Sequence, residues 1–308
     1  MVDRRRALSS IAALGASAGP LQAIALQAGE PSRTAQGAAQ LRAAHQLLER
    51  PLVFDDPIAL RILGAPVVKQ IALDVDRYQT PTARALRAFL VARSRYAEDE
   101  LGRAIKAGTA QYIVLGAGLD TFAYRNPHGK RLRVFEVDHP TTQAWKRARL
   151  QEQSIEFPRS LTFVPVDFEQ DSLAESLRRA GFRRSAPVFI SWLGVSMYLT
   201  RDAVMQTLHF VAQACARGSE IVFDFSVPDD ALSERQRASR ARLAERVAGL
   251  GEPWISTFDP AALGKALTAM GFSHADNFGA AQANELYFAN RADGFGVRGS
   301  ARIMTARV

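Results

Sequence analysis

The stretch QYIVLGAGLD at Gln111–Asp120 decides the fold, together with LRVFEVDHP at Leu132–Pro140. The first stretch is predicted to be a buried strand that runs into a Gly-x-Gly turn. The second is predicted to be another strand with Glu136 and Asp138 near its end. A strand, a glycine turn, a short helix and a second strand with an acidic tip are typical of a Rossmann-type sheet that holds an adenosine. The pair therefore predicts an α/β fold with a nucleoside site at the ends of its strands.

The turn and the acid also indicate which nucleoside cofactor is bound. Gly116 and Gly118 are expected to let the backbone approach the cofactor. Asp138 is expected to accept hydrogen bonds from the ribose hydroxyls, with Glu136 on the same strand face as the alternative. Dinucleotide-binding turns usually carry a third glycine near the pyrophosphate, but this chain has Thr121 there. A ribose acid without the pyrophosphate signature favours S-adenosylmethionine, which has a ribose and no phosphate.

Strand and helix patterns alternate through the middle of the chain. This alternation predicts a parallel, doubly wound sheet whose ligands gather at the carboxyl ends of the strands. The predicted strands are residues 112–115, 133–137, 161–166, 188–192 and 220–225. The predicted helices are residues 82–107, 141–151, 173–180, 202–217, 231–250 and 260–270.

Five motifs in this order and spacing resemble the leucine carboxyl methyltransferase family, in particular its bacterial branch of S-adenosylmethionine-dependent methyltransferases. They are VARSRYAEDEL (Val91–Leu101), VLGAGLDTFAYR (Val114–Arg125), VFEVDHPTTQAWKRARL (Val134–Leu150), VPVDFEQ (Val164–Gln170) and FISWLGVSMYLTRDAV (Phe189–Val204). The resemblance extends from about residue 31 to the C-terminus. It implies a class I methyltransferase sheet, mostly parallel, closed by an antiparallel hairpin that we place at residues 285–289 and 302–306.

The resemblance also implies residues that bind the cofactor. Asp167 and Phe168 end the third strand, where such folds hold the adenine. Arg93 lies in the arginine-bearing helix and is expected to pair with the cofactor's α-carboxylate through a bidentate bond. Arg33, near the start of the matching region, is a further candidate cation.

Ser196, Met197 and Tyr198 are expected to line the pocket of the methyl acceptor. Tyr198 is equally compatible with a core aromatic whose hydroxyl is hydrogen bonded. Eukaryotic members of the family carry a glutamate just after the fourth strand, whereas this chain has Leu193. For that reason we do not carry over the eukaryotic substrate, a protein C-terminal leucine.

The composition predicts one domain without a nucleic-acid or membrane partner. Of 308 residues, 47% are hydrophobic, and no apolar run reaches the roughly 18–20 residues of a membrane span. The net charge of +8 comes from 34 arginines and 5 lysines scattered along the chain, a bias typical of GC-rich coding. The single Cys215 and five histidines show no metal-ligand spacing. Residues 31–308 are expected to form one methyltransferase domain with a helical cap at 31–80 and a lid-like insertion at 228–258.

The first 30 residues allow two interpretations. Arg4, Arg5 and Arg6 precede ALSSIAALGASAG, which resembles an export signal of the twin-arginine type. The apolar part is rich in small residues and is interrupted by Pro20, and export would separate the enzyme from cytoplasmic S-adenosylmethionine. We therefore favour a flexible extension and a cytoplasmic location, with export as the alternative.

Together these observations predict an S-adenosylmethionine-dependent O-methyltransferase, a monomer or homodimer. It is expected to act on a carboxylate or hydroxyl of a small molecule, in secondary metabolism. A nicotinamide-dependent oxidoreductase is the first alternative, disfavoured by Thr121 and by the lack of a Tyr-x-x-x-Lys pair. A cofactor-binding protein without catalysis is the second, and Leu193 in place of the glutamate keeps it open.

Overall fold

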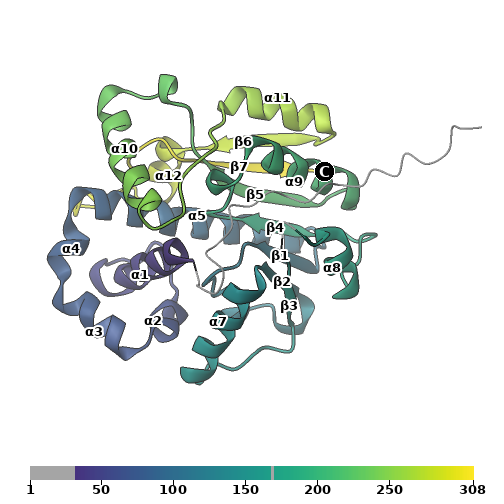
Figure 1. Ribbon diagram of the computed structural model, residues 1–308, viewed down its shortest axis with the longest axis horizontal. Helices are drawn as coiled ribbons and strands as arrows, with labels where there is room; N and C mark the ends of the chain where they lie inside the picture. The colour runs from purple at the N-terminus through teal and green to yellow at the C-terminus, as the bar shows by residue number, and fades with distance from the viewer. Residues whose placement is uncertain (1–31, 168–169) are drawn as a thin grey trace, which may run out of the picture.

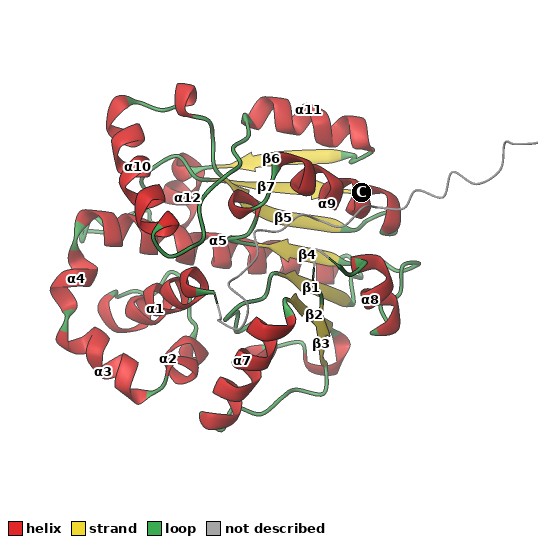
Figure 2. Cartoon of the chain, viewed as in Figure 1, coloured by secondary structure: helices red, strands yellow, loops and turns green. Residues whose placement is uncertain are grey.

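A seven-stranded sheet in the order β3-β2-β1-β4-β5-β7-β6 forms the centre of the computed structural model, which describes residues 32–167 and 170–308. Helices lie on both sides of the sheet (Figures 1 and 2). The first five strands pair in parallel, whereas β7 runs antiparallel to both of its neighbours. The strands are β1 (Gln111–Leu115), β2 (Arg133–Asp138), β3 (Leu161–Pro165), β4 (Phe189–Trp192), β5 (Glu220–Phe225), β6 (His274–Phe278) and β7 (Arg302–Arg307).

Alternating side chains of the central strands build two separate hydrophobic cores. In β1, Ile113 and Leu115 pack with the helices of one face, whereas Tyr112 and Val114 pack with those of the other. This alternation follows from the two-residue period of a strand. The first face is covered by α8 (Leu173–Arg179), α9 (Arg201–Ala214) and α11 (Pro260–Met270), and the second by α5 (Pro81–Lys106), α6 (Phe122–Arg125) and α12 (Ala280–Tyr287).

The predicted fold class is confirmed, and the sheet has the mostly parallel arrangement with an antiparallel strand near the C-terminus. Each of the five predicted parallel strands and six predicted helices is present, with ends that differ by at most three residues. The predicted N-terminal extension, residues 1–30, lies outside the described residues. No helix in the described ranges is long and apolar enough to cross a membrane.

One strand of the predicted closing hairpin is wrong. The segment 285–289 is not a strand, because residues 285–287 end helix α12, which begins after Gly279. The strand that pairs with β7 on its outer side is β6, whose sequence HADNF is largely exposed at the edge of the sheet. A polar edge strand carries little hydrophobic alternation, so its sequence does not reveal it.

Four helices precede α5 and pack beside the carboxyl end of the sheet: α1 (Arg33–Leu48), α2 (Pro57–Leu63), α3 (Ala65–Leu73) and α4 (Val75–Gln79). They share a third, smaller core in which Ile62 and Ile71 are almost completely buried. Helix α1 packs on α5, so this group is attached to the sheet through the longest helix of the described chain.

A buried charged network joins α1 to α5. Arg87 donates to Glu49 through Nη2 at 2.5 Å and through Nε at 3.0 Å to the second oxygen. His45 Nδ1 lies 3.0 Å from the same carboxylate, and its Nε2 accepts from the backbone of Val53. Burial raises the pKa of Glu49, but the bonds from His45 and Arg87 outweigh it and leave that pKa below its usual value. The network therefore stabilises the fold above the usual glutamate pKa and weakens as the pH falls through the lowered value.

Replacement of Arg87 by leucine is expected to lower the free energy of unfolding by about 3–5 kcal/mol, because it leaves the Glu49 carboxylate buried without its main partner. Urea denaturation measures the change. The matched control is Arg178→Leu, which breaks an exposed pair with Glu175 and should cost no more than about 1 kcal/mol. Equal effects of the two variants would contradict the stabilising role assigned to the network.

The thiol of Cys215 is expected to be unreactive in the folded protein. Burial raises its pKa to about 12 from 9.0, so at pH 8 its thiolate fraction is about a thousandfold lower than in the unfolded chain. Titration with Ellman's reagent at pH 8 should show slow release without urea and complete release in denaturant. Because the folded thiol keeps its proton, stability should also fall as the pH rises above 9. Full release from the native protein within the mixing time would disprove the assignment.

Candidate functional site

A cavity of about 1610 Å³ opens at the carboxyl ends of β1, β4 and β5. Helices α1 and α5 form one wall, and α10 (Glu234–Ala248) with the loop that follows it forms another. Pockets for a single small ligand usually measure about 300–1,000 Å³. The cavity therefore has room for a cofactor and a second molecule.

The glycine turn forms part of the cavity wall. Gly116 and Gly118 both have positive φ, 69° and 41°, which disfavours any residue with a Cβ. A Cβ on Gly116 would also lie 2.4 Å from Cγ2 of Val195 in the loop after β4. The backbone N–H groups of Gly116 and Ala117 both donate to the carbonyl of Val137. The turn is thus required by the fold, and it brings bare backbone to the cavity.

Asp138 stands at the tip of β2 and lines the cavity beside this turn. Its Oδ2 accepts from the N–H of Gly118 at 2.5 Å, and its Oδ1 accepts from the N–H of His139 at 2.7 Å. Burial raises its pKa, while these two backbone bonds act in the opposite direction. Each carboxylate oxygen has two lone pairs, so one acceptor site on each remains for a pair of adjacent hydroxyls.

Glu136, the alternative ribose ligand, is placed elsewhere. Its side chain is fully buried and accepts from Nζ of Lys146 in α7 (Pro140–Glu152) at 2.7 Å. It does not appear among the described residues that line the cavity. Burial raises its pKa to about 7, against the opposing charge of Lys146. Glu136 therefore belongs to the packing of α7 on the sheet.

Only one of the two predicted adenine ligands lies within the described residues. Asp167 lines the cavity just after β3, and its carboxylate accepts from the side-chain amide of Gln170 at 2.9 Å. Its backbone N–H donates to Asp171. Phe168 lies outside the described residues. The strand order brings Asp167 to the same edge of the sheet as Asp138.

Arg93 also lines the cavity, and it has a partner that the sequence did not reveal. Its Nη1 donates at 2.5 Å to Asp224, a fully buried carboxylate near the end of β5. The other oxygen of Asp224 accepts from the N–H of Gly194, and its backbone carbonyl accepts from the hydroxyl of Ser196. Asp224 interrupts an apolar, buried strand whose only other carboxylate is Glu220 at its first position, and this is the sequence signal that could have revealed it. Arg95 points elsewhere and pairs with Asp99.

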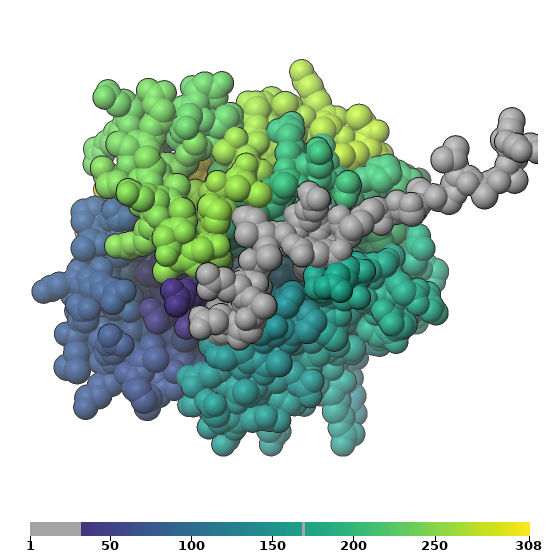
Figure 3. Space-filling view, in the orientation of Figure 1, coloured from purple at the N-terminus to yellow at the C-terminus, as the bar shows by residue number. Residues whose placement is uncertain are grey.

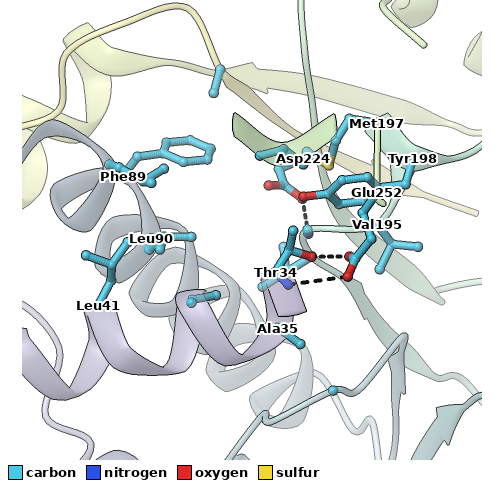
Figure 4. A pocket seen from close by; sticks show the side chains of 18 of the residues that line it. Thr34, Ala35, Leu41, Phe89, Leu90, Val195, Met197, Tyr198, Asp224 and Glu252 are labelled. Atoms are coloured by element: carbon cyan, nitrogen blue, oxygen red, sulfur yellow. Dashed lines mark hydrogen bonds between the residues drawn. The ribbon is translucent and has the colours of Figure 1, made fainter. Parts of the chain in front are cut away.

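The three predicted acceptor residues do not share one role. Met197 and Tyr198 line the cavity, and Figure 4 shows them beside Asp224. Ser196 is fully buried, does not appear among the described lining residues, and binds the backbone of Asp224 and the side chain of Ser256. Burial raises the pKa of Tyr198, so its hydroxyl is protonated at neutral pH. Leu193 lines the cavity and packs partly buried against the core.

Glu252, in the loop after α10, joins the two walls of the cavity. Its carboxylate accepts from the hydroxyl of Ser32 and the N–H of Arg33, both at 2.9 Å, and from the hydroxyl of Thr34. It thereby satisfies amide groups at the positive end of α1. Figure 3 shows the α10 region and the N-terminal helices meeting on this face. Arg33, the further candidate cation, also lines the cavity.

Comparisons with known proteins agree on one family. The family model described as leucine carboxyl methyltransferase matches residues 35–212. A Bacillus subtilis protein named "Putative S-adenosyl-L-methionine-dependent methyltransferase YktD" is 31% identical over 86% of this chain and 93% of its own length. A Mycolicibacterium paratuberculosis protein with the same description is 31% identical over 70% of this chain and 72% of its own.

Solved structures confirm the fold. A crystal structure described as a "putative methyltransferase" from Thermobifida fusca has a TM-score of 0.53 and 19% identity, and covers 91% of this chain and 96% of its own. A Streptomyces avermitilis protein of the family called duf574 has a TM-score of 0.51 and 15% identity, over 80% of this chain and 94% of its own.

Asp224→Asn is expected to weaken both folding and cofactor binding, because it removes the charge that holds Arg93 at the cavity wall. Loss of a buried charged hydrogen bond should lower the free energy of unfolding by roughly 1–3 kcal/mol. Urea denaturation and calorimetric titration with S-adenosylmethionine measure the two effects. Asp276→Asn, which alters an exposed pair with His274, is the control. Unchanged affinity in Asp224→Asn would show that the orientation of Arg93 is immaterial to the cofactor.

Proposed function

The chain belongs to the leucine carboxyl methyltransferase family and is an S-adenosylmethionine-dependent methyltransferase, and we propose that it methylates a carboxylate of a small molecule. One observation supports the proposal: an acid at the tip of β2 lines the cavity beside a glycine turn, and the wall around Met197 and Tyr198 holds no free base among the described residues. Membership of the family does not specify the acceptor, and the proposal adds its chemical class.

The described residues fit the cofactor. The proposed ribose ligand is Asp138, with the turn of Gly116 and Gly118 beneath the sugar and methionine portions, and Asp167 at the adenine. Arg93 is proposed to bind the α-carboxylate through the part of its guanidinium that does not face Asp224. The cofactor, when bound, supplies a methyl group on a positively charged sulfur, which is a good leaving group.

The chain's own contribution to the reaction is alignment. The acceptor oxygen attacks the methyl carbon, the carbon–sulfur bond breaks, and its electron pair goes to sulfur. Holding donor and acceptor in line removes most of the entropy of their encounter. Met197 and Tyr198 are proposed to hold the acceptor, with the Tyr198 hydroxyl positioned by hydrogen bonds to the side chains of Trp254 and Thr34.

The absence of a positioned base supports a carboxylate over a hydroxyl. A carboxylate with a reference pKa near 4 is already ionised at neutral pH, whereas a hydroxyl must lose a proton during the transfer. Among the described lining carboxylates, Asp224 is engaged by Arg93 and Glu252 by the start of α1. Asp120 accepts from the N–H of Phe122 beside the glycine turn, and the other two, Asp138 and Asp167, are proposed to bind the cofactor. The one lining histidine in these ranges, His139, accepts from the backbone N–H of Thr141 as a helix cap.

We also propose a domain organisation and a cellular location for the protein. We infer one catalytic domain over residues 31–308, in which residues 31–80 form a cap and residues 228–258 a lid over the cavity. A cytoplasmic location agrees with this activity, because the cofactor is supplied there.

Calorimetric titration of the purified chain with S-adenosylmethionine, with NAD as the control, tests the cofactor site. We expect micromolar binding of the first and none of the second. A screen of small carboxylic acids should then release S-adenosylhomocysteine faster than the corresponding alcohols. Turnover of alcohols alone would contradict the carboxylate proposal and leave the family assignment intact.

Asp138→Ala is expected to weaken S-adenosylmethionine binding at least about a hundredfold, because two hydroxyls lose a charged acceptor. The same titration measures it. Asp230→Ala, which removes an exposed acid outside the cavity lining, is the matched control and should bind normally. Circular dichroism checks that both variants are folded. Wild-type affinity in Asp138→Ala would mean that the ribose is bound elsewhere.

A further inference from the structure

Four arginines of α10 line the cavity, and three of them lie on one face of that helix. Arg235, Arg242 and Arg246 are spaced by seven and four residues, which places them on the same side. Arg237, on the same helix, is not among the described lining residues. The arginine face is hereafter the set of Arg235, Arg242 and Arg246.

The arginine face has no counter-charge within the described chain. No hydrogen bond or ion pair joins any of the three to another described residue, whereas the neighbouring Arg240 pairs with Asp229 and with the carbonyl of Val227. Arg242 and Arg246 are one helical turn apart, and like charges at that spacing weaken a helix by a few tenths of a kcal/mol. Folding alone therefore gives no reason to gather these cations at a cavity wall.

More positively than negatively charged side chains line the cavity. Nine arginines and five carboxylates line it in the described ranges. Of the carboxylates, Asp120, Asp138, Asp167 and Asp224 follow or end the strands, where the cofactor is proposed to bind, and Glu252 is engaged at the start of α1. The side of the cavity formed by α10 is thus positive, and a positive wall attracts an anion.

An apolar surface forms another part of the same cavity. Leu41 of α1 and Leu86, Phe89 and Leu90 of α5 line it. Figure 4 shows Leu41, Phe89 and Leu90 across the cavity from Met197 and Tyr198. Figure 1 shows α10 on the side of the molecule where α4 and the start of α5 lie. A molecule that fills the space beside Met197 therefore meets apolar side chains and arginines.

We propose that the acceptor is an apolar chain with an anionic group at each end, one methylated beside Met197 and Tyr198 and the other paired with the arginine face. This inference rests on the proposed carboxylate methylation. It adds that the remainder of the acceptor is an apolar chain with a second anionic group. The chain buries its apolar part against α1 and α5, which releases water from both surfaces. Arginine binds carboxylate or phosphate in a bidentate manner, so it discriminates the distal group from a neutral one.

Calorimetry with S-adenosylhomocysteine at saturation tests the proposal, with dodecanedioate as the probe. Dodecanoate has the same chain and one carboxylate, and butanedioate has both carboxylates and almost no chain. We expect dodecanedioate to bind about tenfold more tightly than dodecanoate, and butanedioate to show no binding. Equal affinity of the two long acids would overturn the proposal.

The double variant Arg242→Gln/Arg246→Gln tests the site itself. Both side chains are exposed, so the variant should fold, and its affinity for S-adenosylhomocysteine should be unchanged. It should lose the tenfold preference for dodecanedioate and keep its affinity for dodecanoate. Arg237→Gln, which removes the same charge from the same helix outside the cavity lining, should leave the preference intact. Loss of the preference in both variants would indicate general attraction to a basic helix and overturn the proposal.

The outcomes separate this inference from the proposed function. A folded protein that does not bind S-adenosylhomocysteine refutes the cofactor site, and both proposals fail together. Binding of S-adenosylhomocysteine without any preference for the diacid refutes the present inference alone.

Discussion

The reversal of strand order at β1 is the constraint on which the cavity depends. From β1 the chain builds outward through β2 to β3, and it then returns to place β4 on the opposite side of β1. The loops after β1 and β4 therefore diverge, and space opens between them at the carboxyl ends of the strands. The contact between Gly116 and Val195, which leaves no room for a Cβ, closes the base of that space.

Where side chains are buried on both faces of a strand, the sequence predicts the fold well. The central strand β1 is wholly buried and reads as a continuous apolar run followed by glycine, and such a segment has few alternatives. Strand β6 could not be predicted, because four of its five side chains are at least partly exposed. The apolar Leu286, Tyr287 and Phe288 favour a strand over residues 285–289. The run of helix-forming residues before them, from Ala280, extends a helix instead.

For the candidate site, local motifs predict the residues that come directly at or after the end of a strand. Asp138, Asp167, Met197 and Tyr198 line the cavity because parallel strands bring their carboxyl ends to one edge. Glu136, which period-2 alternation assigns to the same strand face as Asp138, has a buried partner in Lys146 of the next helix, and no local motif predicts that pair. Pairs of interacting residues that lie far apart in the sequence could not be predicted from local motifs. Arg93 and Asp224 are separated by 131 residues, and Thr34 and Glu252 by 218.

The position of β7 has a consequence for the order in which the sheet is completed. Strand β7 lies between β5 and β6 but comes after both in the sequence. During synthesis these two strands leave the ribosome before the strand that separates them, so the main-chain groups of β5 on that side have no strand to pair with for a time. An exposed strand edge is a template for pairing with another chain. The half of the sheet beyond β4 therefore depends on the arrival of β7 for its protection against aggregation in the cell.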